Sequence, residues 1–175
     1  KAVGWDQSDQ LAAQTRSVHI KLITFHPGGS VMTREMQLVA LVKAPSACTA
    51  LELSDFVALV LAGGEVTPDG LPKRVKEAHS LAFIRGGDGL IGVAGLKFPI
   101  KNHRMDVSTS AGIDLPEGDF PLELGWVFVR PNARGGKSYP LCSALVNAVA
   151  EKGIFATSRA NNTAMHSTLD KLGFK

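Results

Sequence analysis

The apolar positions of the chain follow two patterns, one of helical period and one of continuous runs. Apolar residues recur at helical spacing over 50–62, and Thr49 and Glu52 form a capping box, which satisfies free N–H groups at a helix start. A second apolar stripe of this kind covers 140–152. The run Leu122–Val129 is instead almost continuously apolar, as expected for a central strand buried on both faces. These patterns predict two helices and one buried strand.

Shorter apolar runs and turn residues predict the remaining elements. They indicate strands at 17–25, 36–42, 81–85, 90–98 and 154–158, a short basic helix at 73–78 and a last helix after Asn162. A hairpin followed by a strand–helix–strand crossover predicts an α/β (α+β) fold, with a mixed sheet and helices on both faces. We expect one domain over 1–175, with a core at about 36–175 and an N-terminal extension at 1–35.

The segment 99–121 stands apart because it shows no periodicity. It is long for a loop in a compact domain, so it either has a function or contains an element that the pattern does not reveal. It carries charges of both signs and precedes the buried strand, so it is a candidate for shaping a substrate pocket.

Composition and charge narrow the class of protein. Hydrophobic residues make up 45% and charged residues 20%, which is an ordinary globular balance. A net charge of +3 is too small to indicate a nucleic-acid partner, although it mildly favours an anionic ligand such as a phosphorylated cofactor. No apolar run could cross a membrane and no signal-peptide pattern is present, so we expect a cytoplasmic protein without membrane association. The cysteines and histidines show no metal-ligand spacing, so we expect no metal.

The turn between the buried strand and the next helix indicates phosphate binding. Backbone N–H groups and the dipole at a helix start form an anion site. The turn supplies Gly135 and Gly136, which let the backbone approach phosphate oxygens closely, and two cations, Arg134 and Lys137. We therefore expect this turn to bind phosphate, the alternative being that both cations are ordinary surface charges.

Two stretches of the chain resemble a known family. The first, LGWVFVRPNARGGKSYPLCSALV, resembles the acetyl-CoA signature of the GNAT superfamily of acyl-CoA N-acyltransferases, and the second, ATSRANNTAMHSTLDKLGF, resembles the strand and helix that follow it there. The similarity is best over 122–175. It implies a mixed, mostly antiparallel sheet with a splayed gap between the fourth and fifth strands. It also implies direct transfer of an acetyl group from acetyl-CoA to an amine, and a possible homodimer.

The resemblance assigns residues to the cofactor. The pantetheine arm would pair with Val127, Phe128 and Val129, and a backbone N–H near Val127 would stabilise the oxyanion. Asn161 would contact the cofactor near the last helix, unless it serves only as a helix cap. The pyrophosphate would sit on the loop Arg134, Gly135, Gly136, Lys137, Ser138 and Tyr139.

Three residues are candidates for catalysis. Glu123 could take the amine proton, directly or through water, because a carboxylate inside an apolar strand is expected to have a raised pKa. It could equally lie at a solvated strand end. The family often has a tyrosine on its last helix as general acid, whereas this chain has Thr168-Leu169 there. His166 or Ser167 could replace it, and His166 could also be a plain surface histidine.

The chain departs from the family pattern in ways that keep other functions open. Aligned from Arg134, the loop pattern [QR]-x-x-G-x-[GA] places its glycine on Lys137 and its last position on Tyr139. A non-catalytic acyl-CoA-binding or sensor domain is therefore an alternative. A nucleotide-binding module is a third, although Pro131 stands where a P-loop needs glycine. The family's last two strands would follow Phe174, where the sequence ends at Lys175. Either those strands lie outside residues 1–175, or the N-terminal strand or a partner chain occupies that edge.

Overall fold

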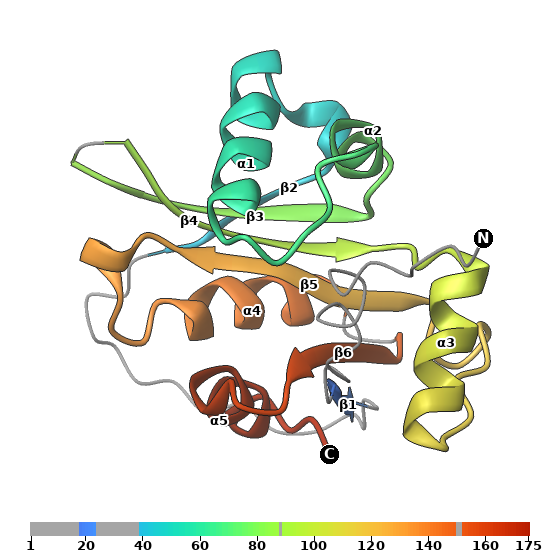
Figure 1. Cartoon of the computed structure of the whole chain (residues 1–175). Helices are drawn as coiled ribbons and strands as arrows, with labels where there is room; N and C mark the ends of the chain where they lie inside the picture. The colour runs from blue at the N-terminus through green and yellow to red at the C-terminus, as the bar shows by residue number, and fades with distance from the viewer. Residues whose placement is uncertain (1–17, 24–38, 88, 150–151) are drawn as a thin grey trace, which may run out of the picture.

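A six-stranded mixed sheet forms the frame of the computed structural model, which describes residues 18–23, 39–87, 89–149 and 152–175 (Figure 1). The strand order is β1–β6–β5–β4–β3–β2, and every neighbouring pair is antiparallel except β5 with β6. The strands are β1 (Val18–Ile23), β2 (Leu41–Lys43), β3 (Ser80–Gly86), β4 (Gly89–Lys97), β5 (Leu122–Val129) and β6 (Ile154–Arg159).

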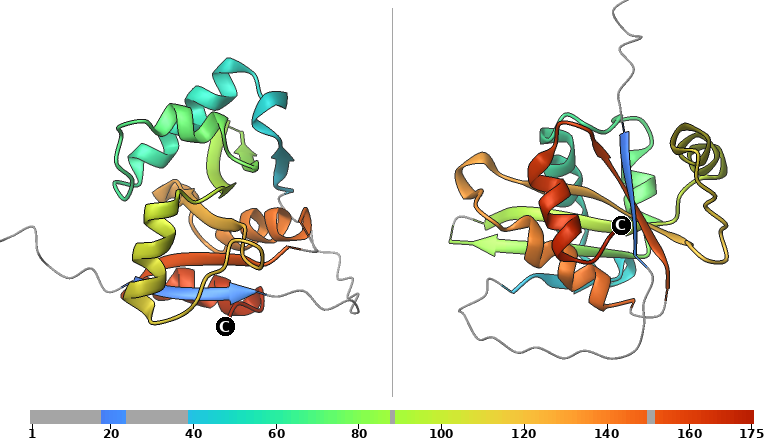
Figure 2. Two further views of the ribbon diagram at one scale, coloured as in Figure 1. Left: turned by 90° about the vertical axis from the view of Figure 1, so that its right-hand side faces the viewer. Right: turned by 90° about the horizontal axis from the view of Figure 1, so that it is seen from below.

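Helices cover both faces of this sheet, as the sequence predicted (Figure 2). On one face lie α1 (Ala50–Ala62), α2 (Leu71–Lys76) and α3 (Lys101–Ala111), with α3 beside the start of β5. On the other face lie α4 (Ser138–Asn147) and α5 (Thr163–Lys171). Two short 3-10 turns, η2 (Pro45–Ala47) and η3 (Pro131–Ala133), complete the described elements. None of the helices in the described ranges is long and apolar enough to cross a membrane.

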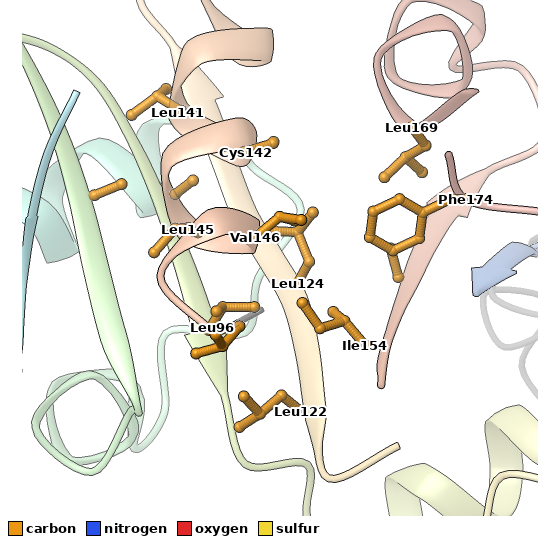
Figure 3. Close-up of a cluster of buried hydrophobic side chains, with 14 of the residues drawn as sticks. Leu96, Leu122, Leu124, Leu141, Cys142, Leu145, Val146, Ile154, Leu169 and Phe174 are labelled. Carbon is orange, nitrogen blue, oxygen red and sulfur yellow. The ribbon is translucent and has the colours of Figure 1, made fainter. Parts of the chain in front are cut away.

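The continuous apolar run of β5 reflects burial on both faces. Leu122 and Leu124 pack into the cluster under α4, where Leu141 and Leu145 also lie (Figure 3). Trp126 belongs to the cluster under α1 and α2 on the opposite face. Each fully buried leucine contributes about 1.5–3 kcal/mol, so β5 is fixed between two apolar layers.

The local signals in the sequence predicted α1 well. The helix spans Ala50–Ala62, and the Thr49 side chain accepts a hydrogen bond from the Glu52 N–H at 3.1 Å. The Glu52 carboxylate in turn accepts one from the Thr49 N–H at 2.9 Å, which completes the capping box. The other helix boundaries differ by a few residues, since α2 begins at Leu71 and α4 covers Ser138–Asn147 rather than 140–152.

The segment 99–121 contains the helix α3, which the sequence pattern did not reveal. Among the residues of α3 only Val107 is buried, so the helix has no apolar stripe to give it away. The predicted strand at 36–42 corresponds to β2 (Leu41–Lys43), and residues 36–38 lie outside the described residues.

The N-terminal strand lies at the edge of β6. β1 pairs antiparallel with β6 from Val18–Arg159 to Ile23–Ile154. One of the two predicted occupants of this edge, the N-terminal strand, is therefore confirmed. The sheet also begins earlier than residue 36, because part of the expected N-terminal extension belongs to it.

Candidate active site

A gap opens in the middle of the sheet, between β5 and β6. The two parallel strands pair only from Leu122–Ile154 to Leu124–Ala156. Beyond that point β5 pairs only with β4, and β6 pairs only with β1, so the two strands separate with distance from α3 (Figure 1). The predicted splay between these strands is confirmed. The edge of Gly125–Val129 that faces β6 has no strand partner in the described part of the chain, so its backbone groups can pair with an extended ligand.

A β-bulge lies at the closed end of the gap. Ala94 of β4 faces both Trp126 and Val127, because the register shifts between Val93 and Gly95. Trp126 has φ of 54°, and such a backbone costs of order 1–3 kcal/mol unless its surroundings enforce it. Here the indole is 8% exposed and packs edge-on against Phe56, with ring centroids 6.1 Å apart.

Gly95 makes room for this bulge. A Cβ at Gly95 would lie 2.8 Å from Cε3 of the Trp126 ring, closer than real contacts allow. The bulge therefore depends on a residue of the neighbouring strand. It turns the backbone of β5 where the gap begins, and such bulges often lie beside active sites.

A charged network lies beside the bulge. Glu123 is 1% exposed. Its Oε2 forms an ion pair with Nζ of Lys97 and accepts a hydrogen bond from Nε2 of His103, each at 3.1 Å. Its Oε1 accepts one from Oγ1 of Thr157, also at 3.1 Å. Thr157 is the first residue of β6 beyond the last pair with β5, so the network sits at the closed end of the gap.

The pKa of Glu123 is lowered, not raised as the sequence predicted. Burial by itself would raise the pKa, but the hydrogen bond from His103 and the positive charge of Lys97 outweigh it. The prediction failed because the apolar run around Glu123 does not reveal partners on β4 and α3. The alternative of a solvated strand end is also wrong, since the side chain is buried.

The loop from Arg134 to Tyr139 lies at the open end of the gap, where β5 ends and α4 begins. Gly135 has φ of 110° and Gly136 of 74°, backbone conformations that favour glycine. Arg134 is exposed and Lys137 half-buried, and neither forms an ion pair with a described residue. The loop thus presents two cations at the start of a helix, where the helix dipole also favours an anion.

A hollow of about 610 Å³ joins this loop to the last helix. Its walls are Gly136, Ser138 and Tyr139 on one side and Ala164, Ser167, Thr168 and Lys171 of α5 on the other. The structure thus brings together three residues of the predicted phosphate loop and the candidate Ser167. Arg134, Gly135, Lys137, Asn161 and His166 do not line this hollow.

The candidates on and near α5 have different surroundings. The side chain of Asn162, not of Asn161, accepts the capping hydrogen bond from the N–H of Met165 at 3.1 Å. His166 is half-buried and Ser167 is exposed. Thr168, in the stretch Thr168-Leu169 where the resemblance would lead one to expect a tyrosine, donates its hydroxyl to the carbonyl of Ala164 at 3.1 Å. Its hydroxyl is therefore already used inside the helix.

Sequence reasoning missed Lys97, His103 and Thr157 as members of the site. They come from β4, α3 and β6, and no motif links them to Glu123 along the chain. The one available signal was a charged segment at 99–121 with His103 in it. Across the described ranges, no group of three His, Cys, Asp or Glu side chains could hold a metal ion.

Solved structures share this mixed α/β fold. A protein assigned to the GNAT acetyltransferase family from Novosphingobium aromaticivorans matches with a TM-score of 0.55 and 19% identity, over 91% of this chain and 60% of its own. A GNAT-family acetyltransferase from Colwellia psychrerythraea matches with a TM-score of 0.54 and 14% identity, over 91% of this chain and 53% of its own. A Drosophila protein matches with a TM-score of 0.55 and 16% identity, over 95% of this chain and 52% of its own.

The chain therefore has the fold of the GNAT acyl-CoA N-acyltransferases. It spans between 52% and 60% of the lengths of these three structures. No protein-family model matches the sequence, and no curated protein matches it. The likeness thus rests on the arrangement of the chain in space.

Proposed function

We propose that this domain is an N-acetyltransferase that moves the acetyl group of acetyl-CoA directly to an amine. The observation that carries this proposal is the gap between β5 and β6, with a bulge where it begins and a basic glycine loop where it ends. A thioester placed along β5 would meet the backbone N–H near Val127, which suits the stabilisation of an oxyanion. The GNAT-type fold supports the proposal at the level of acyl transfer.

Acetyl-CoA would lie along the open part of β5. Its pantetheine arm would pair with the backbone of Val127, Phe128 and Val129, which has no partner strand among the described residues. Its pyrophosphate would take the loop formed by Arg134, Gly135, Gly136, Lys137, Ser138 and Tyr139, and Asn161 would lie near the cofactor at the start of α5. The positive φ angles of the two glycines and the unpaired cations fit a phosphorylated ligand.

The departing coenzyme A thiolate needs a proton. Of the two candidates on α5, Ser167 is favoured because it lines the hollow beside the loop, whereas His166 does not. Tyr139 lines the same hollow and is 39% exposed, so a phenol is also available there. A homodimer and a cytoplasmic location remain predictions.

Calorimetry tests the cofactor. Acetyl-CoA and coenzyme A titrated into the protein should bind at one site in the micromolar range, and ATP should bind at least tenfold more weakly, a difference of about 1.4 kcal/mol. Release of coenzyme A thiol in the presence of a panel of small amines, amino acids and lysine peptides then tests the transfer. Failure of acetyl-CoA to bind would end the proposal, and preferred ATP binding would favour a nucleotide-binding module.

A non-catalytic acyl-CoA-binding domain is the second candidate. It is favoured by the stretch Thr168-Leu169, which has no tyrosine and whose one hydroxyl, that of Thr168, donates to a helix carbonyl. Tight binding of acetyl-CoA without thiol release for any amine would support it.

A further inference from the structure

The buried carboxylate of Glu123 is poorly suited to take a proton. It forms an ion pair with Lys97 and accepts hydrogen bonds from His103 and Thr157, and these contacts occupy both of its oxygens. Protonation would put a hydroxyl among donors and would leave the ammonium of Lys97 without its countercharge. The charged form is thus the one that the network is built to hold.

His103 is the member of this network that can accept a proton. A carboxylate is an acceptor only, so Nε2 of His103 must carry the hydrogen in the bond to Glu123. The neutral ring then has its lone pair on Nδ1, for which no hydrogen bond to a described residue is found. The His103 side chain is 39% exposed, and its Nε2 edge faces a carboxylate that is 1% exposed. The exposed part of the ring therefore lies away from Nε2.

The network also reaches the place where the chemistry would occur. A Cβ at Gly125 would lie 3.5 Å from Nζ of Lys97, so the ammonium sits between the carboxylate and the bulge. Glu123 and Gly125 are two residues apart on β5, so the network and the first residue of the open edge lie within about 7 Å of each other along the strand. Lys97 is a cation that donates to the carboxylate and lies over the Trp126 ring, so it has no lone pair to offer.

We propose that His103 is the catalytic base of the acetyl transfer and that Glu123 is its positioning residue. This inference rests on the proposed function. The substrate ammonium gives one proton to Nδ1 of His103, and the neutral amine attacks the thioester carbon. The new N–C bond forms, the C–S bond breaks, and coenzyme A leaves as a thiolate. The second proton passes from nitrogen to the thiolate through the hydroxyl proposed above as its donor, that of Ser167 or Tyr139. The imidazolium returns the first proton to water, so one proton is released for each acetyl group transferred.

Several charged groups lie close to His103. Glu123 on β5 and Lys97 on β4 are the charged groups that face it from the sheet within the described residues. On α3 itself, Arg104 follows it, but that guanidinium binds the carbonyls of Leu115 and Phe120 and lies over the Phe155 ring. The Glu123 carboxylate at Nε2 is the countercharge that lies beside the ring when a proton is taken up at Nδ1.

Chemical rescue tests this assignment. His103→Ala should lower the rate of thiol release from acetyl-CoA by roughly 100- to 10,000-fold. Added imidazole should then raise the rate of this variant by at least about tenfold. The probe is acetyl-CoA with the best amine of the panel, or with water as the acceptor where no amine reacts. His79→Ala is the matched control, because His79 is half-buried beside Phe98 and Ser80 and takes no part in the network. Its turnover should not respond to imidazole.

A second variant separates the base from its structural contact. His103→Gln keeps an N–H that can donate to Glu123 but has no basic nitrogen, so it should keep the thermal midpoint and lose turnover. Turnover of His103→Ala and His103→Gln at the level of the wild type would overturn the inference while leaving the acetyltransferase in place. Acetyl-CoA binding with no turnover in the wild type would overturn both this inference and the proposed acetyl transfer, and absent binding would end the proposed function altogether.

Discussion

The two ends of β5 solve opposite problems. At its start, Glu123 is buried with a partner for each oxygen, and the network is complete within the protein. At its end, Arg134 and Lys137 have no ion pair with a described residue, and Gly135 and Gly136 hold an open turn. One end is satisfied within the protein, and the other is the end that we propose a ligand completes.

This difference separates the free energy of folding from the free energy of ligand binding. Changes at the closed end should alter folding stability and turnover, because the groups there are desolvated and mutually dependent. Changes at the open end should alter the affinity for acetyl-CoA and leave stability nearly unchanged, because surface charges contribute little to folding. A variant at the closed end that changes only affinity, or one at the open end that changes stability, would contradict this division.

Glu123→Gln is expected to have the largest effect on stability. Removing one member of a buried ion pair costs about 3–5 kcal/mol, and we expect the lower figure because Lys97 can still reach water. The pKa of Glu123 lies below its ordinary 4.5, so its contribution is fully present above pH 4.5 and is lost as the pH falls through the lower folded value. Urea unfolding followed by tryptophan fluorescence should give a large difference from the wild type at pH 7 that shrinks at pH 3.

The control for this variant is Glu117→Gln, which changes an exposed carboxylate. It should unfold like the wild type at both pH values. If the free energy of unfolding of Glu123→Gln differed from that of the wild type by the same amount at pH 7 and pH 3, the carboxylate would not be held in its charged form.

Gly95→Ala tests the dependence of the bulge on its neighbour. The added methyl would meet the Trp126 ring, which Phe56 holds from the other side, so we expect a loss of roughly 1–3 kcal/mol and reduced turnover. Gly118→Ala adds the same methyl where nothing lies within 4 Å. Thermal unfolding and thiol release should change only for Gly95→Ala, and equal behaviour of the two variants would show that the strained turn at Trp126 is not required.

Much of the fold could be predicted from short stretches of the sequence. The capping box of Thr49 and Glu52 fixed the start of α1, and the apolar run of β5 fixed a strand buried on two sides. The glycine-rich turn before α4 was also readable, because its chemistry lies within a few consecutive residues. Each of these features depends on residues that are close in the sequence.

The closed end of the gap could not be predicted in the same way. His103 and Glu123 are separated by 20 residues, and α3 has a single buried residue to reveal it. The bulge is equally hidden, because Trp126 takes its φ of 54° from contacts with Phe56 and the space left by Gly95. The direction of the Glu123 pKa shift followed from those partners, so burial alone gave the wrong sign.

The smallest expected effect, and the sharpest test of the comparison, is at the open end. Arg134→Ala and Lys137→Ala should each weaken acetyl-CoA binding about tenfold, or about 1.4 kcal/mol, since each removes a cation from the phosphates. Their free energies of unfolding should stay within about 0.5 kcal/mol of the wild type. Raising the salt concentration should narrow the difference in affinity, because added ions screen exposed charges.

Lys76→Ala is the matched control, because Lys76 is an exposed cation on α2. It lowers the net charge by the same amount and should leave the acetyl-CoA dissociation constant unchanged. Equal weakening by Lys76→Ala would mean that the whole positive surface attracts the ligand, without a site. Loss of stability in Arg134→Ala or Lys137→Ala would mean that the loop is bonded into the fold, and the contrast between the two ends of β5 would then be one of position only.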